Sequence, residues 1–287
     1  MNIIVLPLYN DWKSLNKLLL IIEKKLSTSD KTKILIINDC STQRINIKLK
    51  KLKKIKEIEV ITNKQNLGSQ KSIAVGLSYL NKLNKKFFIT IMDSDGEDDP
   101  SKIKTMLSAA KNKKQHIIVS CRKKRKEEIF FKLCYKIHLI IFFIFTGKWI
   151  SFGNFSCFYS KNLKRILSNN NIWYAYSAGI LKNNKIIRVH APKNKRLYDK
   201  SKLNYLDLVD HSLRIFTVFR NRFLGVSLVV FILTFICLKQ PLAFLTYFIV
   251  IVLNFLVLQV AKKHCLKEKI NYLNFVKDIK KFKIKLS

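Results

Sequence analysis

The chain has few acidic residues, and its cysteines form no pattern that would bind zinc or build a disulfide scaffold. The six cysteines include no C-x-x-C pair and no framework spacing, so we expect reduced, mostly buried thiols. The N-terminus, MNIIVLPLYND, has no basic residue before its short apolar run and no small-residue cleavage site, which argues against a signal peptide. Internal repeats and low-complexity linkers are also missing. A chain of 287 residues with this character is expected to form one sizeable domain with an appendage.

Positive charge is in large excess. Only 18 Asp and Glu residues stand against 55 Lys and Arg residues, so the formal net charge is +37 at pH 7. Such a surface favours anionic partners, which include nucleic acid, lipid headgroups and phosphorylated small molecules. A compositional bias toward Lys, Ile and Asn explains the excess equally well. Because 48% of the residues are hydrophobic, charged and apolar residues must be segregated along the chain.

Residues 1–125 alternate buried apolar runs with helical patterns. Apolar residues at helical spacing follow the first run as far as Leu26, and further helices are predicted for Ser69–Leu83 and for residues 101–111. The runs that we interpret as strands are Ile3–Leu8, Lys33–Asn38, Ile58–Thr62, Phe87–Met92 and Ile117–Cys121. This alternation predicts an α/β fold, with a doubly wound, mostly parallel sheet and helices on both faces.

Polar residues follow the ends of several of these strands. Ligands of such sheets bind beyond the carboxyl ends of the strands, so these side chains are expected to converge on one crevice. They are Asn10, Asp11, Asp39, Asp93 and Asp95.

The segment MDSDGEDDP, Met92–Pro100, carries the strongest chemical signal. Asp93 and Asp95 are two carboxylates one residue apart at a strand end, where they can share one cation. Oxygen ligands suit Mg²⁺ or Mn²⁺, which also bind phosphate oxygens and neutralise a departing diphosphate. The alternative is that acidic residues before Pro100 form only a polar turn and a helix cap.

The C-terminal part predicts a transmembrane hairpin at 223–261, with spans 223–238 and 242–261. The apolar residues of the second span favour insertion by roughly 4 to 8 kcal/mol, which exceeds a cost of about 3 kcal/mol for Asn254. Basic residues flank the hairpin on both sides, while the loop between the spans holds only Lys239. The positive-inside rule therefore places both ends in the cytoplasm.

Three further segments accompany the hairpin. A juxtamembrane helix is predicted at 206–222 and a basic cytoplasmic tail at 262–287, which either lies along the anionic inner leaflet or is solvated. Residues Ile137–Thr146 are apolar but too short to span a bilayer, so we expect a buried or interfacial helix near 137–149.

Four motifs together resemble glycosyltransferase family 2. They are the PLYND turn at Pro7–Asp11, INDCST at Ile37–Thr42, NKQNLGSQKSIAVG at Asn63–Gly76, and MDSDGEDDP. The resemblance implies a GT-A-like fold in which 1–125 binds a nucleotide-sugar and Asp93 and Asp95 hold a divalent cation, Mg or Mn. The residues that it assigns to the nucleotide-sugar are Pro7, Tyr9, Asp11, Asp39, Asn66, Gly68, Lys71 and Asp93. For Asn66 to Gly68, a simple loop before a helix is the equal alternative.

Within that family, the chain looks like the polyprenyl-phosphate glycosyltransferases, such as dolichol-phosphate mannose synthases and bactoprenol glucosyltransferases. The likeness rests on the Met-Asp-x-Asp-x-x-Asp-x-Pro form of Met92–Pro100, on Arg122 and Arg125, and on KRLYDKSKLNY, Lys195–Tyr205, ahead of the hairpin. It implies an acceptor-side half at 126–205 and transfer to a lipid phosphate, with undecaprenyl phosphate as the leading acceptor. The residues that it assigns to the acceptor phosphate are Arg122, Arg125, Arg196, Ser201 and Lys202, with Arg122 joining Asp93 and Asp95 as catalytic.

The chemistry fits, because a phosphate acceptor is already an anionic nucleophile and needs positive charge more than a base. Each of these cations could equally be an ordinary surface residue. Two departures matter: Asp199 stands where the family usually has Gly, which weakens the lipid-phosphate assignment, and no carboxylate base is recognisable after Gly153, which supports it.

The sequence thus predicts an inverting, metal-dependent glycosyltransferase in the inner (cytoplasmic) membrane, multi-pass, with its catalytic domain in the cytoplasm. Its expected partners are a nucleotide-sugar, a polyprenyl phosphate and the membrane, with no nucleic acid. Whether the chain forms a homo-oligomer is left open. A glycan hydroxyl acceptor is the runner-up and would need a base, for which Asp98, Asp99 and Asp199 are the candidates. Two rivals of another class are a basic nucleic-acid-binding membrane protein and an inactive anchor.

Overall fold

The computed structural model describes residues 1–27, 31–49, 52–122, 129–198, 205–237 and 239–284. The chain divides into two compact units. The sheet unit comprises Met1–Arg125, Ser151–Ser201 and Glu268–Ser287, and the helical unit comprises Lys126–Ile150 and Lys202–Lys267. Residues of the predicted acceptor-side half, 126–205, fall in both units, and the acceptor-side role of this segment stays a prediction.

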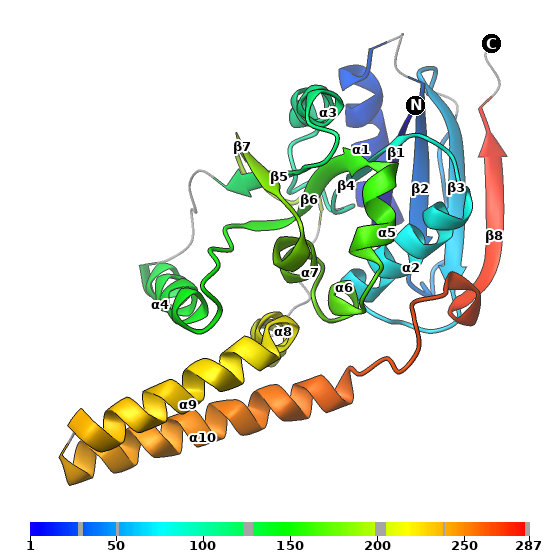
Figure 1. The fold of residues 1–287 in the computed structure, drawn as a ribbon. Helices are drawn as coiled ribbons and strands as arrows, with labels where there is room; N and C mark the ends of the chain where they lie inside the picture. Colours follow the sequence, from blue (N-terminus) through cyan, green and yellow to red (C-terminus); the bar gives the residue numbers. More distant parts are fainter. Residues whose placement is uncertain (28–30, 50–51, 123–128, 199–204, 238, 285–287) are drawn as a thin grey trace. The chain divides into compact units, whose positions relative to one another are not determined.

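The sheet unit is built on an eight-stranded sheet with the order β7-β5-β6-β4-β1-β2-β3-β8 (Figure 1). Strand β1 is parallel to both β2 and β4, β2 is parallel to β3, and β5 is parallel to β7. Strand β6 is antiparallel to β4 and β5, and β8 is antiparallel to β3. The strands are β1 (Asn2–Leu8), β2 (Thr32–Asn38), β3 (Ile55–Asn63), β4 (Phe88–Ile91), β5 (Ile117–Arg122), β6 (Phe152–Tyr159), β7 (Ile186–Ala191) and β8 (Val276–Lys283). The predicted α/β fold with a mostly parallel sheet is confirmed, with antiparallel strands added.

Helices cover both faces of this sheet because alternate residues of each strand point to opposite faces. Ile4 and Leu6 of β1 share one core cluster with apolar residues of α1 and α3. Val5 of β1 and Ile37 of β2 face α2, where Gly76 lets the helix approach, since a Cβ there would lie 2.8 Å from the Ile37 side chain. The helices of this unit are α1 (Trp12–Lys25), α2 (Ser69–Lys82), α3 (Ile103–Asn112), α5 (Leu163–Ile166), α6 (Asn171–Tyr174) and α7 (Tyr176–Asn183), with short 3-10 turns η1 (Pro100–Lys102), η2 (Ser160–Asn162) and η3 (Tyr272–Asn274).

Strand β8 lies inside the segment 262–287, which the sequence predicts as a basic tail. It forms one edge of the sheet and pairs with β3 along its length, from Glu57↔Lys283 to Asn63↔Val276. Phe282 packs against the core cluster, while lysines of the strand are exposed. Lysine-rich edge strands resist unwanted pairing with other sheets, which explains a strand whose sequence resembles a solvated tail.

The helical unit contains α4 (Ile129–Thr146), α8 (Tyr205–Val218), α9 (Arg220–Cys237) and α10 (Gln240–Lys263). Helices α9 and α10 are each long and apolar enough to cross a membrane, and only 17% of the apolar stretch of each is buried. An apolar helix that serves as the core of a soluble protein would be mostly buried, so these two helices weakly indicate membrane association. Helix α9 begins before the predicted span 223–238 and is described as far as Cys237, and α10 extends the predicted span 242–261 at both ends. The helix at the predicted juxtamembrane segment, 206–222, is α8, which ends at Val218.

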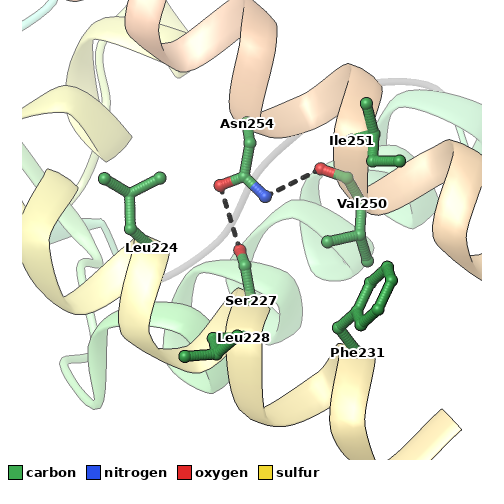
Figure 2. Close-up of a pocket in the computed structure, with 7 residues that line it drawn as sticks. All are labelled: Leu224, Ser227, Leu228, Phe231, Val250, Ile251 and Asn254. Carbon is green, nitrogen blue, oxygen red and sulfur yellow. Dashed lines mark hydrogen bonds between the residues drawn. The ribbon is translucent and has the colours of Figure 1, made fainter. Parts of the chain in front are cut away.

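A polar pair joins α9 to α10 within an otherwise apolar groove (Figure 2). Ser227 donates a hydrogen bond from Oγ to Asn254 Oδ1 at 3.1 Å, and Asn254 Nδ2 donates to the carbonyl of Val250 at 2.9 Å. Asn254, the residue that opposes insertion of the second span, thus has both its amide atoms satisfied. Helix α4 packs on the start of α9, with the rings of Phe145 and Phe223 stacked at 4.5 Å.

Candidate functional site

The loops after β1 and β2 are tied to each other at one edge of the sheet. Parallel neighbouring strands end at the same edge, so the residues after Leu8 and Asn38 are brought together. The backbone N–H of Asn10 donates to Ser41 Oγ at 2.9 Å, and Asn10 Oδ1 accepts from Thr42 Oγ1 at 3.2 Å. Asn10 adopts a φ of 51°, a left-handed conformation that Asn tolerates better than most residues.

Asp39 braces the loop that leads into α2. Its side chain is buried and accepts three hydrogen bonds. Oδ1 accepts from Asn63 Nδ2 at 2.8 Å and from the Leu67 N–H at 2.8 Å, and Oδ2 accepts from the Gly68 N–H at 2.7 Å. Gly68 has a φ of 83°, which a residue with a side chain rarely adopts. The carboxylate thus holds the Asn66–Gly68 loop at the carboxyl edge of the sheet.

The other residues assigned to the nucleotide-sugar lie on the same loops and elements. Asp11 is the N-cap of α1, where its Oδ1 accepts from the Ser14 N–H at 3.1 Å. Asn66 Oδ1 accepts from the Gly68 N–H at 3.1 Å, and Lys71 Nζ lies 5.3 Å from the ring centroid of Trp173. Pro7 is buried in β1, whereas Tyr9 is 42% exposed and is available to a ligand.

The MDSDGEDDP turn after β4 is organised by its own acidic residues. The Asp93 N–H donates to Asp98 Oδ2 at 3.0 Å, and Asp99 caps η1 by accepting from the Ser101 N–H at 2.9 Å. Gly96 has a φ of 84°, and a Cβ at this position would lie 2.5 Å from the Leu197 side chain. Asp98 and Asp99 therefore have the structural roles that the alternative interpretation of this motif assigned to them: Asp98 stabilises the turn and Asp99 caps a helix.

Asp93 and Asp95 each accept hydrogen bonds from neighbouring residues. Asp93 Oδ1 accepts from Asn154 Nδ2 of β6 at 2.9 Å. Asp95 Oδ1 accepts from the Glu97 N–H at 2.9 Å, and its Oδ2 lies 2.9 Å from Arg196 Nη2. Asn154 thus gives Asp93 a neutral donor, and Arg196 places a guanidinium beside Asp95.

Two basic residues converge on this turn from the segment after β7. Arg196 Nε lies 3.3 Å from Glu97 Oε1, and Lys193 Nζ lies 2.9 Å from Glu97 Oε2. Backbone hydrogen bonds from Asn194 to Glu97 and from Leu197 to Asp95 run between the same two segments. The structure thus places Arg196, predicted to hold acceptor phosphate, directly beside the acidic pair.

Burial and the neighbouring charge of Asp93 raise the pKa of Asp95 to about 6, although the Glu97 N–H and the charge of Arg196 act in the opposite direction. The Asp95 side chain is only 14% exposed. A carboxyl group with such a pKa lies in a place where additional positive charge would be stabilising.

The acidic pair fits a divalent cation of the Mg²⁺ or Mn²⁺ kind. Both side chains supply the oxygen ligands that these ions prefer, and their mutual repulsion would be relieved by the ion. Within the described residues, no group of three His, Cys, Asp or Glu side chains is arranged to hold a metal ion. Mg²⁺ is commonly bound by one or two carboxylates together with phosphate oxygens and water, so two carboxylates suffice.

Several predicted acceptor residues are not described. Arg125, Ser201 and Lys202 lie outside the described residues, as does Asp199. Arg122 is the last residue of β5 and pairs with Ala191 of β7, but its side chain is also outside the described part. Among the residues assigned to acceptor phosphate, the structure therefore describes the side chain of Arg196 and no other.

The prediction missed four side chains around the acidic pair: Glu97 lies in the turn, Lys193 and Asn154 contact the turn, and Gln70 contacts Asn154. Glu97 stands within the MDSDGEDDP motif, so its presence near the site was open to inference. Lys193, Gln70 and Asn154 carry no local pattern that separates them from other polar residues. They reach the site only because of the order of the strands.

The family model of glycosyl transferase family 2 matches residues 3–197. No curated protein matches the chain. Among solved structures, the chain is similar to a mycobacterial protein at 9% identity, covering 77% of this chain and 74% of that one with a TM-score of 0.51. It is also similar to glucosyl-3-phosphoglycerate synthase from Mycobacterium tuberculosis in complex with phosphoglyceric acid, at 9% identity, 77% and 79% coverage and a TM-score of 0.50. At such identities the likeness concerns the fold alone.

Proposed function

Because the chain belongs to glycosyltransferase family 2, we propose that it transfers a sugar, with inversion, from a nucleotide-sugar to a polyprenyl phosphate at the cytoplasmic face of a membrane. Undecaprenyl phosphate is the leading acceptor. The observation that carries the proposal is the acidic pair Asp93 and Asp95 at the end of β4, with Arg196 beside it.

The donor would lie along the carboxyl edge of the sheet. Tyr9 offers an exposed ring, and Asp39 holds the Asn66–Gly68 loop beside it. We assign Pro7, Asp11 and Lys71 to the surroundings of the same pocket. A divalent cation held by Asp93 and Asp95 would stabilise the negative charge of the leaving nucleoside diphosphate.

The acceptor proposal rests on positive charge. A lipid phosphate is already ionised at pH 7, so its oxygen can attack the anomeric carbon without a strong base. Arg196 lies at the acidic pair and can turn its guanidinium toward a phosphate, which it recognises better than a point charge does. Arg122, Arg125, Ser201 and Lys202 are assigned to the same phosphate from the sequence resemblance.

The hydroxyl-acceptor alternative needs a carboxylate base. Asp98 and Asp99, two of its three candidates, accept hydrogen bonds from the backbone N–H groups of Asp93 and Ser101. Carboxylates that organise a turn in this way are poorly suited to remove a proton from a sugar hydroxyl. This observation favours the phosphate acceptor.

We assign membrane attachment to α9 and α10. The sheet unit supplies the chain both before and after this hairpin, because β8 pairs with β3. This pairing supports a hairpin with both ends on the same side of the membrane, in agreement with the flanking basic residues and the cytoplasmic assignment. Helix α4 exposes an apolar stripe at Ile137, Ile140 and Ile144 and is assigned to the interface.

The experiment is transfer of radiolabelled sugar into organic-extractable lipid, using membranes that contain the full chain, with and without added undecaprenyl phosphate. A panel of nucleotide-sugars and either Mg²⁺ or Mn²⁺ is supplied. Asp95→Asn is expected to abolish the label. Asp99→Asn is the matched control, because it makes the same chemical change in the same turn and Asn is an equally good cap.

The outcomes separate the alternatives. Metal-dependent label in an acid-labile lipid that is lost in Asp95→Asn and kept in Asp99→Asn supports the proposal and identifies the sugar. Label in a glycan rather than a lipid phosphate, with loss in Asp99→Asn, would support the hydroxyl acceptor. If no sugar is transferred from any donor, the hypothesis of an inactive anchor is favoured. If the chain is instead retained on nucleic acid, the hypothesis of a nucleic-acid-binding membrane protein is favoured.

A further inference from the structure

Two side chains link Asp93 to a buried backbone group by a chain of three hydrogen bonds. The N–H of Tyr176, at the start of α7, donates to Gln70 Oε1 at 2.7 Å. Gln70 Nε2 donates to Asn154 Oδ1 at 3.1 Å, and Asn154 Nδ2 donates to Asp93 Oδ1 at 2.9 Å. The four residues come from α7, α2, β6 and the end of β4, all within the sheet unit.

The direction of this chain is determined at its buried end. A backbone N–H can only donate, so the Gln70 amide must turn its oxygen toward Tyr176 and its nitrogen toward Asn154. The Asn154 amide must then turn its oxygen toward Gln70 and its nitrogen toward Asp93. Each amide has one orientation that satisfies both neighbours, and that orientation presents an N–H donor to the carboxylate.

The buried end is itself rigid. Gln70 is 8% exposed and Tyr176 is fully buried. The Tyr176 hydroxyl lies 2.7 Å from Ser156 Oγ, two positions after Asn154 on β6, which ties α7 to the same strand a second time. Buried polar networks in which every member is satisfied specify one arrangement, because breaking any bond leaves an unpaired buried group.

We propose that Asn154 is a positioning residue for Asp93 and that Gln70 sets its orientation. This inference rests on the proposed function, in which Asp93 and Asp95 hold a divalent cation. The hydrogen bond from Asn154 Nδ2 fixes the orientation of the Asp93 carboxylate, and so directs this carboxylate as a ligand for the cation.

The test is the affinity of the purified full chain for Mn²⁺, measured by electron paramagnetic resonance with UDP and GDP present and no acceptor. Asn154→Leu removes the donor and is expected to weaken Mn²⁺ binding by about 10-fold or more, as loss of supporting hydrogen bonds to metal ligands commonly does. Transfer activity in Asn154→Leu should recover at saturating Mn²⁺, because the ligands remain. A purely structural role would lower the rate at every concentration of the metal.

Gln70→Glu is the sharper variant, because it keeps the shape of the side chain. The introduced carboxylate can still accept from the Tyr176 N–H but cannot donate to Asn154. Asn154 would then reverse its amide and turn its oxygen toward Asp93, which repels the carboxylate. We expect a loss of Mn²⁺ affinity similar to that in Asn154→Leu, and no further loss in the double variant, because both changes break one chain.

Asn162→Leu is the matched control for lost stability. Asn162 is a buried asparagine of the same unit, and its Nδ2 donates to the carbonyls of Lys114 and Tyr159 at 2.8 and 3.1 Å. It should lower the melting temperature without changing Mn²⁺ affinity. The proposal is overturned if Asn154→Leu and Gln70→Glu bind Mn²⁺ as wild type does, if Asn162→Leu shows the same loss, or if the wild-type chain binds no Mn²⁺. The two proposals can fail separately. If the wild-type chain transfers no sugar to lipid, but the variants still lose Mn²⁺ affinity, the proposed lipid-phosphate acceptor is refuted and the positioning role of Asn154 is retained.

Discussion

Asp39→Asn tests whether the buried carboxylate after β2 acts as a brace for the Asn66–Gly68 loop. In the wild-type chain, one oxygen accepts from Asn63 and Leu67, and the other accepts from Gly68. An asparagine can keep the first oxygen, but its amide nitrogen would then face the Gly68 N–H. The variant loses one charge-assisted hydrogen bond and places two donors against each other.

The magnitude follows from these contacts. A hydrogen bond to a charged group contributes about 1.5–3 kcal/mol, and Gly68 is exposed, so water relieves part of the loss. We therefore expect the free energy of unfolding to fall by about 2 kcal/mol. At roughly 2–4 °C per kcal/mol for a domain of this size, the melting temperature should fall by about 4–8 °C.

The assay is thermal unfolding of the full chain in detergent, followed by tryptophan fluorescence. Trp12 and Trp173 of the sheet unit are each 4% exposed and report on its packing. Asp11→Asn is the matched control, because Asn and Asp are equally good N-caps and the change should be nearly neutral. If Asp39→Asn has the same melting temperature as Asp11→Asn while its KM for the nucleotide-sugar rises, Asp39 is a direct ligand and its role as a brace is refuted.

Three further predictions concern other parts of the chain. Gly96→Ala should destabilise the sheet unit by about 1–3 kcal/mol, because φ is 84° and the new Cβ would lie 2.5 Å from a leucine side chain; an unchanged melting temperature would contradict this. Burial, followed by the charge of Arg214, lowers the pKa of His211 to about 4, so the unfolded state binds a proton first as the pH falls. The free energy of unfolding should therefore decline between about pH 6.5 and pH 4 by up to about 3 kcal/mol. In His211→Gln, the melting temperature should differ less between about pH 7.5 and pH 5 than it does in the wild-type chain. Cys237, the last residue of α9, and Cys265, which follows α10, are both exposed and lie at opposite ends of the second predicted span. In single-cysteine chains, an impermeant maleimide should label Cys237 in intact cells and Cys265 only after permeabilisation. Labelling of both cysteines in intact cells would refute the hairpin topology.

The parallel strands and the helical hairpin were predictable because their signals are local. A buried strand such as β2 is a short apolar run, predicted at Lys33–Asn38 and found at Thr32–Asn38. Parallel strands end at one edge, so Asp39 and Asp93 could be placed there from their positions in the sequence alone. The two long uncharged stretches after Arg222 likewise require only length and composition.

Local patterns did not predict β6 between β4 and β5, or β8 at the edge. Insertion of β6 brings Asn154 to Asp93 across 61 positions of sequence, and no periodicity encodes that proximity. The lysines of β8 face solvent at the sheet edge, so its alternation is too weak to be distinguished from a solvated tail. The pairing of Arg196 with Asp95 depends in the same way on the position of the segment after β7.

The sequence by itself determined the α/β class, the carboxyl-edge location of Asp39, Asp93 and Asp95, and the apolar hairpin, because each depends on residues close together in the chain. Only the tertiary structure decided how those carboxylates are held: Asp39 by the loop that it braces, Asp93 by Asn154, and Asp95 by Arg196. The physical reason is that hydrogen bonds and ion pairs join groups that are close in space, and strand order, rather than local sequence, determines which distant groups meet.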